Sequence, residues 1–154
     1  MYACFQEALL WLPTGQYEIL YNQILEIKPY HTNALNNLGE LYRVTGELQK
    51  AKDCYEKAIK FNPNLASAYN NLGLIYLKNK DNFKAKDLFH RAIELDPNLA
   101  NANYNLGIIY KELGYYEKAK SFYKKVIEII PNHSETLNNL GIIYEELGEI
   151  QKAK

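Results

Sequence analysis

The chain has 154 residues, 47% of them hydrophobic, and 18 Lys and Arg against 18 Asp and Glu, so its formal net charge is zero. A neutral chain has no bulk field to attract nucleic acid or an anionic membrane surface, which argues against both partners. Cys4 and Cys54 form no CxxC motif, so neither a disulfide framework nor a zinc site is predicted.

No membrane or export segment is predicted near the start of the chain. The apolar stretch ALLWL is too short for a membrane span, and no basic run with a long apolar core and a cleavage site surrounds it. The sequence therefore predicts a soluble, cytoplasmic protein with two free thiols.

One motif returns four times at 34-residue intervals: NNLGELY from Asn36, NNLGLIY from Asn70, YNLGIIY from Tyr104 and NNLGIIY from Asn138. Its Leu and Tyr lie four residues apart and therefore share a helix face. An alanine follows nine residues after each Tyr, and in three copies an aromatic residue and a proline come after it. This spacing predicts a second helix, so each unit is a pair of helices.

In chain order, residues 1–31 form a degenerate first unit. Ala8 and Trp11 occupy places for small and aromatic residues, Gly15 is expected to make the turn, and Pro29 closes the unit. The interval from Gly15 to Pro29 is three residues shorter than the matching interval of the next unit. Either its second helix is shorter or its turn is altered.

Three full units follow at residues 32–65, 66–99 and 100–133, and an incomplete unit occupies residues 134–154. A glycine follows the leucine of every motif: Gly39, Gly73, Gly107 and Gly141. Glycine in mid-helix costs ~1 kcal/mol relative to alanine, so its return at one position indicates a close helix crossing. The predicted neighbour is the second helix with its matched alanine.

Glycine and asparagine mark the turns. Left-handed caps are expected at Gly46, Gly114 and Gly148. In the unit of residues 66–99, Asn79 and Lys80 occupy this turn, and asparagine is the better substitute for glycine. An asparagine after each proline is expected to cap the next helix: Asn64, Asn98 and Asn132.

This pattern over residues 32–154 resembles the tetratricopeptide repeat (TPR) family in nearly every position. The resemblance implies an all-α fold, a right-handed solenoid of antiparallel helix pairs whose first helices line a concave groove and whose second helices form the outer wall. It also implies a non-enzymatic scaffold for protein interactions. No catalytic constellation or cofactor site is predicted, because the three histidines, in turns or a second helix, lie near no nucleophile or carboxylate pair.

Two rows of residues before the Leu-Gly pairs form the candidate site for a protein or peptide partner: Asn37, Asn71, Asn105 and Asn139, and one residue earlier Asn36, Asn70, Tyr104 and Asn138. An amide offers the donor and acceptor that a peptide backbone also offers, and helices ~8–10 Å apart match about three residues of extended peptide. In similar TPR arrays this position faces the groove. Biased codon usage and family habit remain alternative explanations.

Three residues after Asn37, Asn71, Asn105 and Asn139 come Glu40, Leu74, Ile108 and Ile142. The three apolar residues are open to two interpretations, which are packing between units and contact with apolar side chains of a ligand. Both can hold in part.

The resemblance distinguishes two modes of binding. One TPR subclass binds acidic chaperone C-termini with Lys, Arg and Asn, but the matching helix-start positions here are Asn33, Ser67, Asn101 and Glu135, which argues against that mode. The Asn-Leu-Gly copies are more similar to the superhelix of O-linked N-acetylglucosamine transferases, where an Asn ladder holds protein substrates.

Two alternatives stay open beside the peptide-binding scaffold. The incomplete last unit is expected to leave Leu140, Ile143 and Tyr144 uncovered, so a second copy could bind there and form a homo-oligomer. The chain could also be the substrate-recruiting part of a larger enzyme.

Overall fold

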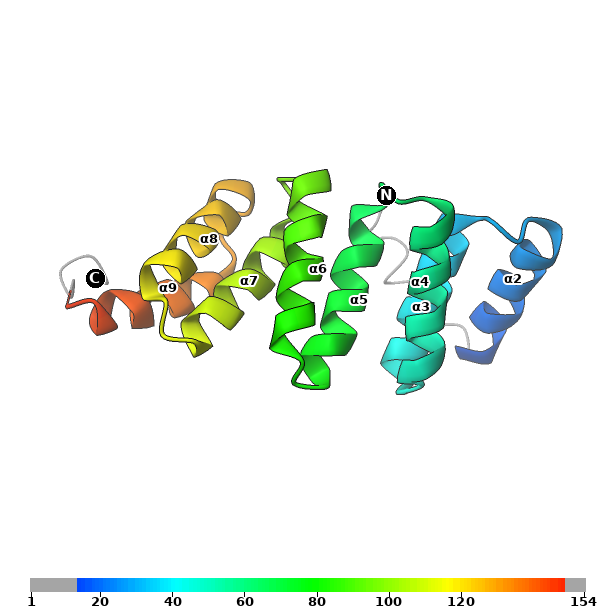
Figure 1. Cartoon of the computed structure of the whole chain (residues 1–154), viewed down its shortest axis with the longest axis horizontal. Helices are drawn as coiled ribbons and strands as arrows, with labels where there is room; N and C mark the ends of the chain where they lie inside the picture. Colours follow the sequence, from blue (N-terminus) through cyan, green and yellow to red (C-terminus); the bar gives the residue numbers. More distant parts are fainter. Residues whose placement is uncertain (1–13, 149–154) are drawn as a thin grey trace.

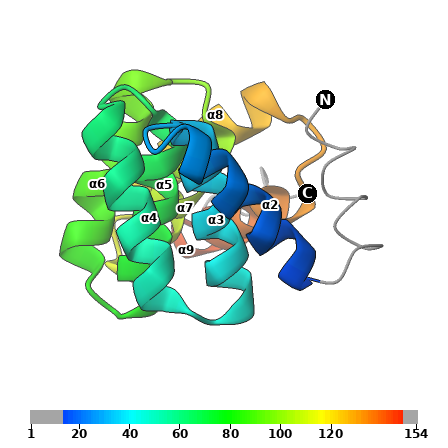
Figure 2. The same cartoon turned by 90° about the vertical axis from the view of Figure 1, so that its right-hand side faces the viewer.

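The computed structural model describes residues 14–148, which form a row of helices with α2 at one end and α9 at the other (Figure 1). The helices are α2 (Thr14–Ile27), α3 (Thr32–Thr45), α4 (Leu48–Phe61), α5 (Ala66–Lys78), α6 (Asn82–Leu95), α7 (Ala100–Glu112), α8 (Tyr116–Ile129) and α9 (Ser134–Glu146). This described part contains no strand, so the predicted all-α solenoid is confirmed. Figure 2, viewed along the row, shows the second helices α4 and α6 to one side of the first helices α3 and α5.

In each full unit an aromatic ring of the second helix lies against the glycine of the first. The distance from an added Cβ to the nearest ring atom is 2.7 Å for Gly39 and Tyr55, 2.7 Å for Gly73 and Phe89, and 2.3 Å for Gly107 and Tyr123. Any larger side chain must therefore move the ring, which confirms the predicted close crossing. The space is needed by the ring, which lies four residues after the matched alanine.

Apolar side chains of the described helices form four buried clusters, and the partly buried Tyr76 and Tyr110 each border two of them. The leucines of the four motifs are 0–8% exposed: Leu38, Leu72, Leu106 and Leu140. Burying one leucine stabilises the fold by ~1.5–3 kcal/mol, so each copy of the motif contributes to the packing energy.

Three of the four turns after the first helices follow the prediction. Gly46, Gly114 and Gly148 have φ of 87°, 76° and 69°. In the turn after α5 the left-handed residue is Lys80, with φ 60°, whereas Asn79 has φ −82°. Position 80, and not 79, is 34 residues after Gly46. The left-handed conformation therefore falls at the equivalent position of the repeat, even though asparagine adopts it more readily than lysine.

The predicted asparagine caps are wrong. The helices α5 and α7 begin one residue later, at N-caps Leu65 and Leu99 that have no side-chain capping bond. Histidine caps α3 and α9 instead. Nδ1 of His31 accepts from the Ala34 N–H at 3.1 Å, and Nδ1 of His133 accepts from the Thr136 N–H at 3.3 Å.

The degenerate first unit differs from its prediction. Gly15 lies inside α2 and makes no turn. Helix α2 is 14 residues long, as is α4, so the second helix of this unit is not shorter. Tyr17 and Tyr21 are its buried residues. The expected positions Ala8 and Trp11 lie outside the described residues.

The last unit is better covered than predicted. Leu140 is 8% and Ile143 0% exposed, because both pack with Ala119 and Tyr123 of α8. The expectation that they are uncovered is therefore wrong, since the preceding unit covers this face. The exposed apolar residues of α9 are Leu137, at 48%, and Ile142, at 39%.

Candidate functional site

The two asparagine rows link successive first helices. Three hydrogen bonds cross from one repeat to the next: Asn71 Nδ2 to Asn36 Oδ1 at 3.2 Å, Asn105 Nδ2 to Asn70 Oδ1 at 3.2 Å, and Asn139 Nδ2 to the Tyr104 hydroxyl at 3.4 Å. In each, the residue directly before a Leu-Gly pair donates to the residue two positions before the Leu-Gly pair of the preceding repeat. We call the face of α3, α5, α7 and α9 that carries these rows the ladder face.

The ladder explains why asparagine is placed in mid-helix despite its poor propensity. Each bond between repeats contributes ~0.5–1.5 kcal/mol. The structure thus gives the rows a role in joining repeats, which had not been predicted.

These bonds leave part of each amide unused. A side-chain amide has two N–H groups and an oxygen with two lone pairs, so one bond between repeats occupies one position of several. Exposure differs along the rows: Asn70, Asn105 and Asn139 are buried, Asn36, Asn37, Asn71 and Tyr104 are half-buried, and Asn138 is exposed. A ligand would therefore meet the edges of the amides.

The apolar row is partly core. Leu74 packs against the cluster that contains Phe89 and Leu106, while remaining half-buried. Ile108 is also half-buried, and Ile142 is 39% exposed. The packing interpretation therefore holds in part for Leu74, and Ile142 on α9 is the most exposed of the three residues.

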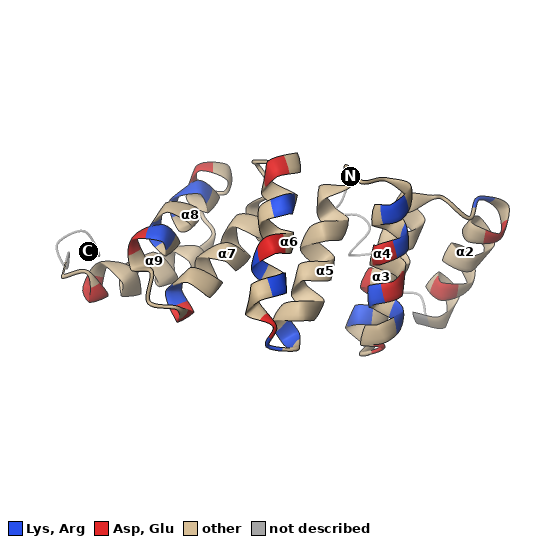
Figure 3. Ribbon diagram, in the orientation of Figure 1, with Lys and Arg blue, Asp and Glu red and all other residues tan. Residues whose placement is uncertain are grey.

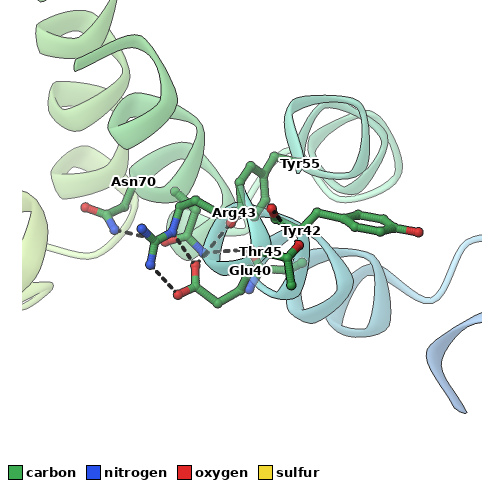
Figure 4. Close-up of polar contacts among 8 residues, drawn as sticks. Glu40, Tyr42, Arg43, Thr45, Tyr55 and Asn70 are labelled. Atoms are coloured by element: carbon green, nitrogen blue, oxygen red, sulfur yellow. Dashed lines mark hydrogen bonds and ion pairs between the residues drawn. The ribbon is translucent and has the colours of Figure 1, made fainter. Parts of the chain in front are cut away.

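A charged pair in α3 was not predicted; below, the full units α3–α4, α5–α6 and α7–α8 are called the first, second and third repeats. The Arg43 guanidinium donates two hydrogen bonds to Glu40, with Nη2 2.6 Å from Oε1 and Nε 2.8 Å from Oε2. The Tyr55 hydroxyl donates to the same Oε2 at 3.2 Å (Figure 4). The hydrogen bond to Glu40 raises the pKa of Arg43, and burial, with the Glu40 charge, raises the pKa of Tyr55.

Lys111 is the matching cation two repeats later, because it follows Arg43 by 68 residues, twice 34. Its Nζ donates to Asn139 Oδ1 at 2.6 Å. The position between them in the repeat register is Leu77, so the cation does not return in every repeat. Because Leu77 interrupts the series, the 34-residue period does not predict a role for Arg43 and Lys111.

The other surfaces carry less specific features. Charges of both signs alternate along the second helices α4, α6 and α8 (Figure 3), and Lys50 with Glu47 and Lys125 with Glu128 form pairs three residues apart. Two shallow pockets, one beside Tyr115 and Leu147 and one beside Tyr76 and Leu88, include no residue of the ladder rows. None of the described helices is long and apolar enough to cross a membrane.

Known families and structures resemble this arrangement. A family model described as "Tetratricopeptide repeat" matches residues 64–132 and 98–154, and one described as "TPR repeat" matches residues 39–80. A comparison with curated protein sequences finds no significant match.

Two solved structures illustrate the likeness. A crystal structure of MamA shares 30% identity with a TM-score of 0.74, covering 86% of this chain and 78% of that chain. The "First TPR of Spaghetti (RPAP3) bound to HSP90 peptide SRMEEVD" shares 27% identity with a TM-score of 0.72, covering 76% of this chain and 95% of that chain.

Proposed function

The chain belongs to the tetratricopeptide repeat family, and we propose that it binds an extended peptide segment of a partner protein along the ladder face. A protein-interaction scaffold is the role that its fold and its relatives support. The proposed role is non-enzymatic and cytoplasmic. The free, buried Cys54 supports a reducing compartment.

The observation that carries the proposal is the unbroken line of side-chain amides across four successive first helices. Bonds between repeats hold these amides in place, which reduces the ordering cost when a ligand binds. The unused positions of the amides match the donors and acceptors of a peptide backbone. Leu74, Ile108 and Ile142 lie three residues further along the helices and would contact apolar side chains of the segment.

The RPAP3 structure with its bound peptide supports binding of a peptide segment by this fold. That peptide, SRMEEVD, is acidic. In this chain the four helix-start positions contain no Lys or Arg: Asn33, Ser67, Asn101 and Glu135. We therefore propose that backbone contacts with asparagine dominate, and that no clamp of helix-start cations is used.

The test is to select peptides by display against the parent protein and to measure their affinity for two double variants. Asn71→Ala with Asn105→Ala alters the ladder, whereas Asn98→Ala with Asn132→Ala alters exposed turn asparagines and is the matched control. Thermal unfolding followed by circular dichroism identifies a temperature at which the parent and both variants are folded, and affinities are measured at that temperature.

We expect the ladder variant to bind about tenfold or more weakly, since two backbone hydrogen bonds of ~0.5–1.5 kcal/mol each would be lost. The turn variant should bind like the parent. Equal affinity of both variants would reject the ladder face as the binding site.

Self-association is a second candidate, favoured by the exposure of Leu137 and Ile142 on α9. Light scattering of the parent and of Leu137→Ser with Ile142→Ser tests it. A larger mass for the parent alone would support self-association, and a monomer in both cases would exclude it.

A further inference from the structure

In the first repeat the chain supplies a carboxylate to its own ladder face. Glu40 accepts from the Tyr55 hydroxyl and from two guanidinium nitrogens of Arg43 (Figure 4). Three parts are needed for this arrangement: a phenol from the second helix, a cation three residues after the carboxylate, and the carboxylate itself. All three are present between α3 and α4.

The third repeat has the same phenol in the same orientation. In both repeats the ring atoms Cε1, Cδ1 and Cζ are the atoms nearest to a Cβ added at the glycine, at 2.7, 2.9 and 3.1 Å for Tyr55 and Gly39, and closer still for Tyr123 and Gly107. The Tyr123 hydroxyl therefore points towards position 108 as the Tyr55 hydroxyl points towards Glu40. Position 108 is isoleucine, which cannot accept a hydrogen bond.

The third repeat also has the cation but lacks the carboxylate. Lys111 stands where Arg43 stands in the first repeat, and its ammonium group uses one of three N–H donors on Asn139. Among the described residues the Tyr123 hydroxyl has no hydrogen-bond partner, although the residue has no exposed surface. A buried donor without an acceptor is unfavourable, and native proteins rarely retain one.

The second repeat shows that the fold does not need this hydroxyl. The corresponding pair there is Leu74 and Phe89, both apolar, and the Phe89 ring lies 2.7 Å from a Cβ added at Gly73, the same distance as for Tyr55 and Gly39. Packing alone would thus be satisfied by phenylalanine at position 123. The unpaired phenol, together with a cation at the helix position that Arg43 occupies in the first repeat, points to an acceptor that comes from another molecule.

We propose that the third repeat binds a carboxylate of the partner segment, which takes the place that Glu40 occupies in the first repeat. One carboxylate oxygen accepts from the Tyr123 hydroxyl and the other from Lys111 Nζ. The Ile108 side chain must turn aside, because the hydroxyl is covered in the free protein. This proposal rests on the proposed function, since the segment must lie along the ladder face.

The surrounding charges limit the gain. Burial raises the pKa of Tyr123, and its electrostatic interactions with Tyr104 and Glu112 raise it further, so an anion at this position meets repulsion from Glu112. In the proposed complex the Lys111 ammonium group offsets that repulsion. We therefore expect a contribution of about tenfold in affinity, the size of a single charge-assisted hydrogen bond.

A ligand-free experiment tests the two donors first. Ile108→Glu places a carboxylate beside Tyr123 and Lys111, whereas Leu74→Glu places one beside Phe89 and Leu77 and is the matched control. We expect the melting temperature of Ile108→Glu to exceed that of Leu74→Glu, and the difference to shrink when Tyr123→Phe is added. Equal melting temperatures of the two Glu variants would overturn the proposal.

The second experiment uses peptides selected by display against the parent, and copies in which each Asp, Glu or terminal carboxylate is replaced by its amide. One replacement should weaken binding to the parent about tenfold but leave binding to Tyr123→Phe unchanged. Ile108→Glu should bind the original peptide weakly, because its own carboxylate fills the position.

The outcomes separate the two proposals. Peptides that bind and depend on Asn71 and Asn105, yet show no loss on any carboxylate replacement, would overturn the carboxylate position and leave the proposed function intact. A replacement effect of equal size in the parent and in Tyr123→Phe would also overturn it. A failure to select any peptide would overturn both.

Discussion

The amide of Asn71 joins two repeats and still lies half-buried on the ladder face. Its Nδ2 donates to Asn36 of the preceding repeat, and its Oδ1 accepts from the neighbouring Asn70 at 3.1 Å. The side chain is thus part of the connection between α3 and α5 as well as of the candidate site. A loss of function in an asparagine variant must therefore be separated from a loss of stability.

Removing the amides should destabilise the fold. In Asn71→Ala with Asn105→Ala, two bonds between repeats are lost, and Asn70, which is 4% exposed, loses a donor to its oxygen. The gain in helix propensity offsets this in part, so we expect a net loss of about 1–3 kcal/mol in urea unfolding. Asn138→Ala, at an exposed position, should cost nothing. A double variant as stable as the parent would show that the ladder does not hold the repeats together.

His90 makes stability depend on pH. Burial, helped by the charge of Lys86, lowers its pKa from the ordinary 6.5, against opposing effects of Asp87 and Glu94 on the same helix. From the other helices, Tyr110 of α7 lies 3.1 Å from Nε2, and the charge of Lys118 of α8 also lowers the pKa. The unfolded chain therefore binds a proton more readily than the folded one.

The sign of the effect follows from this difference. The stabilisation is present above pH 6.5 and is lost as the pH falls from there through the folded-state pKa. We expect the free energy of unfolding to fall more between pH 7.5 and pH 5 in the parent than in His90→Gln. Parallel pH profiles would contradict the assignment, because the other histidines are common to both proteins.

At the scale of the helices, the 34-residue period predicted the hairpins correctly, because the Leu-Gly-Tyr motif and the matched alanine define both buried faces. The errors lie where one residue decides a local conformation. The asparagine caps failed because α5 and α7 begin one residue later, and Gly15 was assigned to a turn although it lies within α2. Composition alone cannot fix a helix end to within one residue.

The glycines at the helix crossings should not be equivalent. An added Cβ at Gly107 meets Tyr123 Cε1 at 2.3 Å, whereas at Gly141 it meets no described atom within 4 Å. Gly107→Ala should therefore destabilise the protein by ~1–3 kcal/mol through overpacking. Gly141→Ala should be neutral or stabilise it by up to ~1 kcal/mol through helix propensity. Equal effects in denaturant unfolding would show that the ring gives way without cost.

The turn after α5 contains residual strain that can be relieved. Lys80 has φ 60°, a conformation that is unfavourable for a residue with a Cβ, whereas Asn79 has an ordinary negative φ. Lys80→Gly should raise stability by ~0.5–1 kcal/mol, as expected for relief of a left-handed residue. Asn79→Gly is the control and should lower stability or leave it unchanged. The reverse order in thermal unfolding would refute this account of the turn.

At the scale of the whole molecule, the repeat aligns equivalent side chains into rows, so one position read from the sequence becomes a line across four helices. The rows of asparagine and the apolar residues beside them were therefore predictable as a group. The bonds between the rows were not, because they connect positions 35 residues apart in a register that only the stacking of repeats creates. Arg43 and Lys111 were not predicted because their repeat position holds a cation in only some of the repeats, and Tyr123 was predicted only as a packing aromatic residue.

The most direct test of binding along the ladder face is the NMR spectrum of asparagine side-chain amides during titration with a peptide selected against the parent. The rows contribute Asn37, Asn71, Asn105 and Asn139, and the turns contribute Asn64, Asn98 and Asn132 as internal controls. We expect the side-chain amide resonances of the rows, from α3 to α9, to shift progressively as peptide is added, while the resonances of the turn asparagines do not move. Shifts confined to the turn asparagines, with the row amides unmoved by a peptide that binds, would contradict the account.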